Sequence, residues 1–174
     1  MKKKCLPSII SIVTAVLLIW IDQWTKLLAV RYLKDASAIE LIPGVFELTY
    51  VENHGAAFGM LQNQQIFFLI MTVIVLIGVA WLYLRMPFER RYLPLRACFT
   101  AFVAGAIGNM IDRLYSGYVV DFFYFRLIDF PVFNVADCYV TITVILFAIM
   151  FLFCYKEEEL SFIPGMASKK EKNV

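Results

Sequence analysis

The chain has 174 residues, of which 61% are hydrophobic and 17% are charged, and its mean hydropathy is +0.75. This composition lies outside the usage of soluble domains and indicates an integral membrane protein. The net charge is only +2, with Lys and Arg in short clusters rather than on one broad face, which excludes nucleic-acid binding.

Four apolar segments are long enough to cross a bilayer as helices. A hydrocarbon core about 30 Å thick needs roughly 20 mostly apolar residues in an α-helix. Segments of this kind run from about Leu6 to Leu28, Ile66 to Leu84, Ala97 to Tyr115 and Val135 to Tyr155. The sequence therefore predicts an all-α polytopic membrane protein with four transmembrane helices, in which residues 1–155 form a single domain.

The first span has a second possible interpretation, as a cleaved signal peptide, because it follows a Lys-rich start. The apolar run ends in WIDQWTK, without the small-x-small motif of a cleavage site. This ending favours an uncleaved first helix.

Basic residues predict which end of each helix faces the cytoplasm. They precede the first span, fill the loop between the second and third, and follow the fourth, at Lys2–Lys4, at Arg85, Arg90, Arg91 and Arg96, and at Lys156, Lys169, Lys170 and Lys172. By the positive-inside rule these segments and both termini are cytoplasmic. Residues 29–65 and 116–134 then face outward, and residues 156–174 form a charged cytoplasmic tail, which its composition predicts to be poorly ordered.

The first outer segment contains a predicted strand region. The sequence VFELTYVEN, at Val45–Asn53, is rich in β-branched and aromatic residues and follows the turn pair Pro43-Gly44. We expect one or two short strands there. The GAAFG sequence at 55–59 permits close approach of the backbone to another group, and is equally compatible with a plain turn.

Polar side chains within the spans converge on one layer. With a rise of 1.5 Å per residue, Asp22 lies roughly 24 Å across the first helix and Lys26 lies one turn further out. The last third of the third helix and the start of the fourth carry the others, Asn109, Asp112, Arg113, Asn134 and Asp137. Each charge costs about 2.5 to 3.5 kcal/mol in a bilayer, so this layer predicts a functional site.

Simpler structural roles remain open for several of these residues. Asp22 and Lys26, spaced i,i+4, can neutralise each other on one helix face. Asn134 and Asp137 can cap the fourth helix. Asp112 can form an interfacial salt bridge with the arginine that follows it.

Asp121 is the strongest catalytic candidate, because the sequence VVDFF surrounds its carboxylate with apolar side chains. The only histidine, His54, lies in an outer segment, and neither GxSxG nor HExxH is present. The four cysteines form no CxxC pair, so we expect no metal. Carboxylate chemistry remains: Asp121 and Asp137 can share one proton, activate water and polarise a carbonyl.

Four sequence boxes stand in order between the spans: DQWTK at 22–26, NHGAAF at 53–58, GNMIDRLYSGYVVDF at 108–122 and FNVAD at 133–137. Together they resemble the boxes of the lipoprotein signal peptidases (signal peptidase II). The resemblance implies that Asp121 and Asp137 are the catalytic dyad. It implies that eight further residues bind substrate or support the site: Asp22, Lys26, Asn53, Gly55, Asn109, Asp112, Arg113 and Asn134.

The resemblance also implies a fold and a reaction. A small extracytoplasmic β-sheet cradle is expected around Val45–Asn53, and a mobile helix within Phe122–Phe130. The implied activity is that of an aspartyl endopeptidase of the bacterial inner (cytoplasmic) membrane, with its active site near the outer leaflet. It removes the signal peptide of a prolipoprotein at the bond before an S-diacylglyceryl cysteine, and it needs no cofactor. We also expect membrane lipids as partners, inhibition by globomycin-type cyclic peptides and a monomeric state.

Two other classes of protein remain as alternatives. A small transporter can use Asp22, Lys26, Asp112 and Asp121 as a proton or cation relay. Such relays extend toward the middle of the bilayer or recur in repeats, whereas these charges stay in one outer layer. A structural membrane scaffold is the other alternative, and it would tolerate replacement of Asp121.

Overall fold

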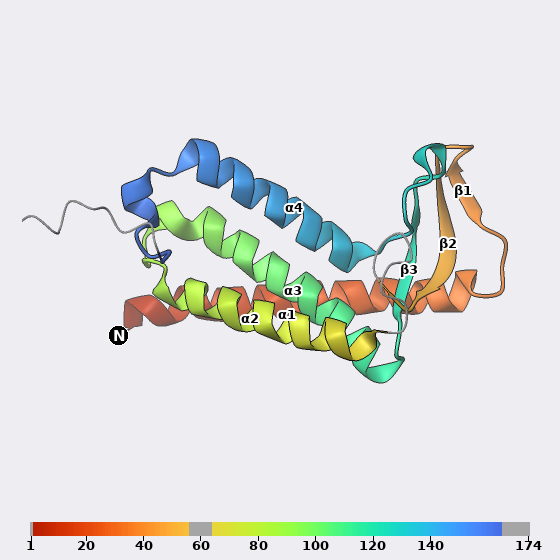
Figure 1. Cartoon of the computed structure of the whole chain (residues 1–174), viewed down its shortest axis with the longest axis horizontal. Coiled ribbons are helices and arrows are strands. Elements are labelled where there is room, and N and C mark those ends of the chain that lie inside the picture. The colour runs from red at the N-terminus through yellow and green to blue at the C-terminus, as the bar shows by residue number, and fades with distance from the viewer. Residues whose placement is uncertain (1, 56–63, 165–174) are drawn as a thin grey trace, which may run out of the picture.

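The computed structural model describes residues 2–55 and 64–164 and contains four long helices that run beside one another (Figure 1). They are α1 (Lys2–Leu33), α2 (Gln65–Arg85), α3 (Leu93–Tyr115) and α4 (Val135–Ile149). A π-helical segment, Met150–Cys154, extends α4. All four are long and apolar enough to cross a membrane. The predicted fold of four transmembrane helices is therefore confirmed.

Helix α1 extends five residues beyond the predicted end of the first span, to Leu33. The apolar run ends at Leu28, but Ala29 and Leu33 are buried against Val120 and Phe122, in an apolar cluster that lies at one end of the bundle. This contact gives the last turn of α1 a protein surface to pack on, where the sequence alone shows only a boundary of hydrophobicity.

A three-stranded antiparallel sheet lies at this same end of the bundle (Figure 1). Strand β1 (Ile39–Ile42) pairs with β2 (Phe46–Asn53), and β2 pairs with β3 (Val119–Tyr124). Gly44, with φ of 70°, occupies the turn between β1 and β2 in the left-handed region that glycine adopts without strain. The expectation of a small sheet around residues 45–53 is confirmed. The GAAFG segment after Gly55 lies outside the described residues.

Strand β3 is a feature of the second outer segment that sequence analysis did not predict. It contains Asp121 and continues through residues 122–124. The helix expected within Phe122–Phe130 is described as the short 3-10 turn Arg126–Ile128. The strand forms because VVDFFY is rich in β-branched and aromatic residues and because it pairs with β2.

Helix α3 is the centre of the bundle and contacts each of the other three helices. It approaches α4 closely at Gly105, where an added Cβ would lie 2.5 Å from the carbonyl oxygen of Ala136. A small residue lets the two backbones meet, as is common between transmembrane helices. Helix α2 lies at the periphery, with every residue from Gln65 to Arg85 exposed or half-buried.

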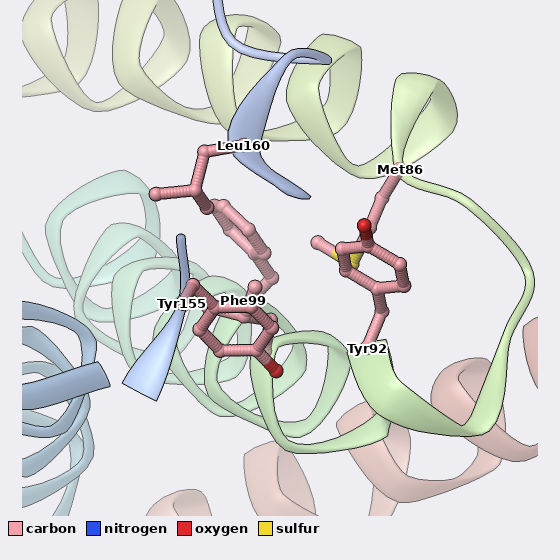
Figure 2. Packing of buried hydrophobic residues seen from close by; sticks show 6 residues of the cluster. Met86, Tyr92, Phe99, Tyr155 and Leu160 are labelled. Carbon is pink, nitrogen blue, oxygen red and sulfur yellow. The ribbon is translucent and has the colours of Figure 1, made fainter. Parts of the chain in front are cut away.

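A second apolar cluster closes the opposite end of the bundle (Figure 2). It includes Tyr92, Tyr155 and Leu160, of which Leu160 is 3% exposed. Leu160 belongs to the 3-10 helix Glu157–Leu160, and the Tyr92 hydroxyl donates to the carbonyl of Glu159 at 2.9 Å. The expectation that the chain is poorly ordered from residue 156 is therefore wrong for residues 156–164. Residues 165–174 lie outside the described chain.

Candidate active site

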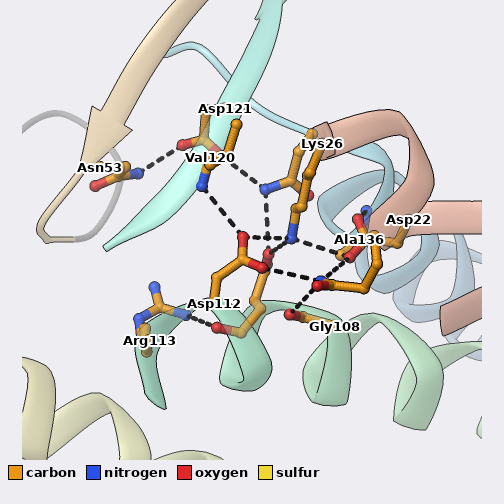
Figure 3. Close-up of polar contacts among 12 residues, drawn as sticks. Asp22, Lys26, Asn53, Gly108, Asp112, Arg113, Val120, Asp121 and Ala136 are labelled. Carbon is orange, nitrogen blue, oxygen red and sulfur yellow. Dashed lines mark hydrogen bonds and ion pairs between the residues drawn. The ribbon is translucent and has the colours of Figure 1, made fainter. Parts of the chain in front are cut away.

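Strand β3 brings Asp121 to the sheet end of the helix bundle, where its side chain is 2% exposed. Its Oδ2 accepts a hydrogen bond from Asn53 Nδ2 at 2.8 Å, and its Oδ1 accepts one from Asn134 Nδ2 at 2.6 Å (Figure 3). Asn53 is the last residue of β2, and Asn134 precedes the first residue of α4. Three separate elements therefore hold one carboxylate.

Asp137 stands in the first turn of α4 and forms a capping box with Asn134. The Asp137 amide donates to Asn134 Oδ1 at 3.0 Å, and the Asn134 amide donates to Asp137 Oδ2 at 3.1 Å. The capping role considered for this pair is thus present. It does not occupy the whole carboxylate, because Oδ1 of Asp137 accepts from Asn109 Nδ2 at 2.8 Å.

The amide of Asn134 connects the surroundings of the two aspartates. Its Nδ2 donates to Asp121 and also to Oδ1 of Asn109, the latter at 3.1 Å. Asn109 in turn donates to Asp137. Asn134 is fully buried, so these hydrogen bonds are made away from bulk water, where polar groups hold their partners most strongly. Two amides therefore link two carboxylates in a single network.

A buried ion cluster lies next to this network (Figure 3). Lys26 Nζ contacts Asp22 Oδ2 and Asp112 Oδ2, each at 3.0 Å, and donates to Asn109 Oδ1 at 2.9 Å. The ion pair considered for Asp22 and Lys26 is present and extends to a second carboxylate. The pair considered for Asp112 and Arg113 is not formed within the described residues, because Asp112 pairs with Lys26 instead.

Gln23 is a member of this cluster that sequence analysis missed. Its Nε2 lies within hydrogen-bond distance of Asp22 Oδ2 at 3.2 Å, of the Gly108 carbonyl at 3.2 Å and of Asp112 Oδ1 at 2.9 Å. The signal was available, since Gln23 lies within the DQWTK box and a polar amide in a span calls for a partner.

The ion cluster also contacts the backbone of neighbouring elements. Asp22 Oδ1 accepts from the Ala136 amide at 2.9 Å, and Asp112 Oδ2 accepts from the Val120 amide at 3.2 Å. Ala136 belongs to α4 and Val120 to β3, so two carboxylates on α1 and α3 fix the elements that carry Asp137 and Asp121.

A cleft of about 540 Å³ opens in front of the two aspartates. Asp121 and Asp137 both line it, together with three other predicted residues, Asn53, Gly55 and Arg113. Aromatic and aliphatic side chains form much of the remaining wall: Phe68, Phe125, Phe130, Pro131, Val132, Phe133 and Ile142. The other five predicted residues are absent from this lining: Asp22, Lys26, Asn109, Asp112 and Asn134. The ten predicted residues thus divide into a cleft-facing half and a half that lies behind it.

Arg113 is the only cationic side chain among the five predicted residues that line the cleft. Its Nη1 donates to the Asn109 carbonyl at 3.3 Å, and Nη2 makes a long contact to the Gly55 carbonyl at 3.5 Å. Its Cζ lies 4.9 Å from the centre of the Phe68 ring. Within the described residues, Nε is buried without a hydrogen-bond partner. The guanidinium therefore has donor capacity left for a group in the cleft.

Burial first, and then the negative charge of Asp137, raise the pKa of Asp121 to about 7. The hydrogen bonds from Asn53 and Asn134 act the opposite way, because they favour the ionised carboxylate. A carboxyl group with this pKa holds a proton over a large part of the neutral range, as a general acid must.

The residues described in the structure include no group of three or more His, Cys, Asp or Glu side chains placed to hold a metal ion. His54 packs its ring against Tyr118, with centroids 5.3 Å apart, and it does not line the cleft. The polar groups that do line it are two carboxylates, an amide, a guanidinium, the Thr141 hydroxyl and the Cys138 thiol, so the arrangement offers proton transfer and hydrogen bonding.

Three comparisons with known proteins agree with one another. A family model described as signal peptidase (SPase) II matches residues 14–153. The lipoprotein signal peptidase of Streptococcus thermophilus is 44% identical over 158 residues, which cover 91% of this chain and 97% of that protein. That of Caldanaerobacter subterraneus subsp. tengcongensis is 42% identical over 144 residues, covering 82% and 96%. A solved bacterial membrane enzyme superposes with a TM-score of 0.70 at 37% identity, covering 83% of this chain and 94% of that one.

Proposed function

The chain belongs to the signal peptidase II family, and from this premise we propose that it is an aspartyl endopeptidase with Asp121 and Asp137 as its catalytic dyad. The substrate is a prolipoprotein, and the bond cleaved is the one before its S-diacylglyceryl cysteine. The observation that carries the proposal is that two carboxylates from distant elements line one cleft while one buried residue, Asn134, donates to both. Its side-chain Nδ2 donates to Asp121 and its backbone amide donates to Asp137.

The dyad works with one shared proton. Two carboxylates on one cleft cannot easily ionise together, and the pKa of about 7 at Asp121 supports a pair that holds one proton near neutral pH. The ionised member takes a proton from water while the water oxygen attacks the scissile carbonyl. The protonated member donates to the carbonyl oxygen, and a proton then passes to the amine that leaves. No cofactor takes part.

Lys26 orients the amides behind the dyad. An ammonium group only donates hydrogen bonds, so its contact with Asn109 requires the amide oxygen to face Lys26. The amide nitrogen of Asn109 then faces Asp137, where it donates at 2.8 Å. Lys26, Asp22 and Asp112 are therefore positioning residues, which act on the carboxylates through Asn109 and the backbone.

The substrate lies at the depth where the carboxylates meet the outer leaflet. The aromatic wall of the cleft, with Phe125, Phe130 and Phe133, suits an apolar peptide segment next to a lipid anchor. Asn53 and Arg113 align the peptide through hydrogen bonds. Membrane lipids surround the enzyme, which acts as a monomer and is inhibited by globomycin-type cyclic peptides.

The enzyme lies in the bacterial cytoplasmic membrane with both termini in the cytoplasm. Residues 1–155 form the peptidase domain and residues 156–174 the charged cytoplasmic tail. The clustered basic residues support this orientation through the positive-inside rule. Reporters fused after Glu89 and at the C-terminus should read cytoplasmic, and one near Ile39 should read external. An external C-terminus would contradict the orientation.

The decisive experiment is cleavage of a purified lipidated prolipoprotein by wild type and by Asp121→Asn. Removal of a general acid or base typically costs 10²–10⁴-fold in rate, so the variant should lose at least about a hundredfold while still inserting and purifying normally. Asp129→Asn is the matched control, because Asp129 is exposed on the same outer segment, does not line the cleft and keeps a left-handed φ that asparagine tolerates.

The control should cleave at about the wild-type rate, and Asp137→Asn should behave like Asp121→Asn. Retention of more than about a tenth of the wild-type rate in either dyad variant would show that the dyad assignment is wrong. If a chelator abolished wild-type activity and zinc restored it, the protein would instead be a metalloenzyme.

A further inference from the structure

Arg96 is a buried cation in the first turn of α3, at the end of the bundle opposite the candidate active site. It is 3% exposed, and its Nη2 donates to the carbonyls of Met86 at 2.7 Å and Pro87 at 3.3 Å. Its Nε and Nη1 are buried without a hydrogen-bond partner in the part of the chain that the structure describes. A guanidinium offers five N–H donors in a fixed plane, so most of its donor capacity is unused.

Two aromatic rings compensate the charge of Arg96 only in part. Its Cζ lies 4.0 Å from the centre of the Phe88 ring and 4.7 Å from that of Tyr83. Aromatic faces attract a cation, but they supply no oxygen to accept from its N–H groups. Among the described residues, Arg96 forms no ion pair with a carboxylate. The site therefore carries a net positive charge and unused donors.

Arg96 lines a hollow of about 270 Å³ between α1 and α3. The other lining residues are Ile10, Ser11, Thr14, Leu93, Ala97 and Thr100. Three of them carry hydroxyl groups, so the hollow combines a guanidinium with short polar side chains. Leu93 and Ile10 on its border are 50% and 57% exposed, so the hollow borders on surface that faces lipid in the membrane.

A second hollow, of about 320 Å³, continues from the first and shares Ser11 and Thr100 with it. Its remaining walls are mostly apolar side chains of α1, α2 and α3. Tyr83 stands at the junction, because it lines the second hollow, donates to Ser11 Oγ at 2.7 Å and lies under the Arg96 guanidinium. A hollow with one guanidinium and three hydroxyl groups on its wall thus opens beside one that is almost wholly apolar.

The depth of Arg96 matches the head-group boundary of a bilayer. The third span starts at Arg90, and six residues at 1.5 Å each place Arg96 about 9 Å further in. The span of 26 residues is about 39 Å long, close to the 40–45 Å thickness of a bilayer with its head groups. Arg96 therefore lies near the level where lipid phosphates meet the hydrocarbon core.

From this geometry we infer that the two hollows form a binding site for an anionic phospholipid of the leaflet opposite the active site. The phosphodiester accepts from the unused N–H groups of Arg96, and the hydroxyls of Ser11 and Thr14 contact the head group. The Thr100 hydroxyl already donates to the Arg96 carbonyl at 2.7 Å. One acyl chain enters the second hollow. A guanidinium matches phosphate in both charge and geometry.

The head group decides the selectivity of this site. An acyl chain gains little on leaving the bilayer for an apolar hollow, because lipid tails are as apolar as the side chains that line it. A zwitterionic lipid would bring its own ammonium group toward Arg96, whereas an anionic lipid brings only the opposite charge. Another basic residue at the same end, Arg90, adds to this preference.

Lipid titration of the delipidated protein, followed by native mass spectrometry, tests the inference. The probes are phosphatidylglycerol, phosphatidylcholine with the same acyl chains, and the deacylated head group glycerophosphoglycerol. We expect phosphatidylglycerol to bind roughly tenfold more tightly than phosphatidylcholine, equal to about 1.4 kcal/mol. The deacylated head group should bind more weakly than the intact lipid, and equal affinity would overturn the assignment to a lipid.

Arg96→Gln should abolish the preference for phosphatidylglycerol. Arg85→Gln is the matched control, since it removes the same charge from an exposed position that contacts Trp81, outside both hollows, and it should keep the preference. Retained selectivity in Arg96→Gln, or an equal loss in Arg85→Gln, would overturn the inference. If Arg96→Gln does not purify as a single species, Ala97→Phe fills the first hollow from its exposed wall and should give the same loss. Unchanged selectivity in that variant would also overturn it.

Discussion

Replacement of Lys26 by methionine tests the buried ion cluster most directly. The side chain of Lys26 is 4% exposed and lies 3.0 Å from each of two carboxylates, on Asp22 and Asp112. Methionine has a similar length but no charge, so Lys26→Met leaves two buried carboxylates without their counter-ion. Removal of one partner from a buried ion pair typically costs about 3 to 5 kcal/mol, because the remaining charge is uncompensated.

This loss should be visible as a lower melting temperature in detergent. For a protein of this size, about 1 kcal/mol corresponds to roughly 2 to 4 °C, so Lys26→Met should lower Tm by about 6 to 20 °C. Lys34→Met is the matched control: Lys34 also pairs with a carboxylate at 3.0 Å, on Glu52, but its side chain is 45% exposed. Exposed pairs contribute about 0.2 to 1 kcal/mol, so the control should shift Tm by no more than about 4 °C.

A double variant separates charge from side-chain volume. Adding Asp112→Asn to Lys26→Met removes one of the two orphaned carboxylates, so the double variant should be more stable than Lys26→Met alone. Equal Tm losses in Lys26→Met and Lys34→Met would refute the argument that the cluster stabilises the fold through buried charge.

Three further predictions concern the site and its substrate. Gly108→Ala should reduce both stability and cleavage, because an added Cβ would clash with Asp22 Oδ2. Gly78→Ala is its control, since nothing lies within 4 Å of a Cβ at that position. The kcat/KM should fall as pH rises above about 7, because Asp121 then loses the proton that burial and the charge of Asp137 help it to hold. The infrared band of the protonated carboxyl should disappear over the same pH range. In Asp137→Asn this band should disappear at a lower pH, because the charge that raises the pKa of Asp121 is gone. An unchanged band position in that variant would contradict the coupling of the two carboxylates. A prolipoprotein with an unmodified cysteine should be cleaved about a hundredfold less efficiently in kcat/KM, equal to about 2.7 kcal/mol, and comparable cleavage of both substrates in one detergent would exclude recognition of the lipid.

The transmembrane architecture could be predicted from sequence because a bilayer imposes a single length scale. The predicted spans 66–84 and 135–155 differ from α2 and from α4 with its π-helical extension by one residue at most at each end. Apolar composition and helix rise are local properties, so they need no knowledge of neighbours. The ends that were predicted less well, such as that of α1, are those where a helix packs on other protein rather than on lipid.

Contacts between distant residues explain what the sequence did not reveal about the fold. Strand β3 depends on pairing with β2, whose residues lie about 70 positions earlier in the chain, as in the pair Val51 and Asp121. The order of residues 156–164 depends on Leu160, which is buried in a cluster with Tyr92 and Met86. An isolated charged segment gives no sign of such a contact, because its composition alone cannot show which apolar surface is available to it.

The sequence by itself determined which residues belong to the polar layer, since helix rise converts their positions into a common depth. Only the tertiary structure decided how these residues divide between cleft and support. Asp121 and Asp137 line the cleft, whereas Asn109 and Asn134 lie behind it and donate to them. The depth of a residue in the membrane follows from its position along a helix, and the sequence gives that position directly. The direction of a side chain and its partner at about 3 Å arise only when four helices and a sheet pack together, because hydrogen bonds form over distances far shorter than the width of the layer.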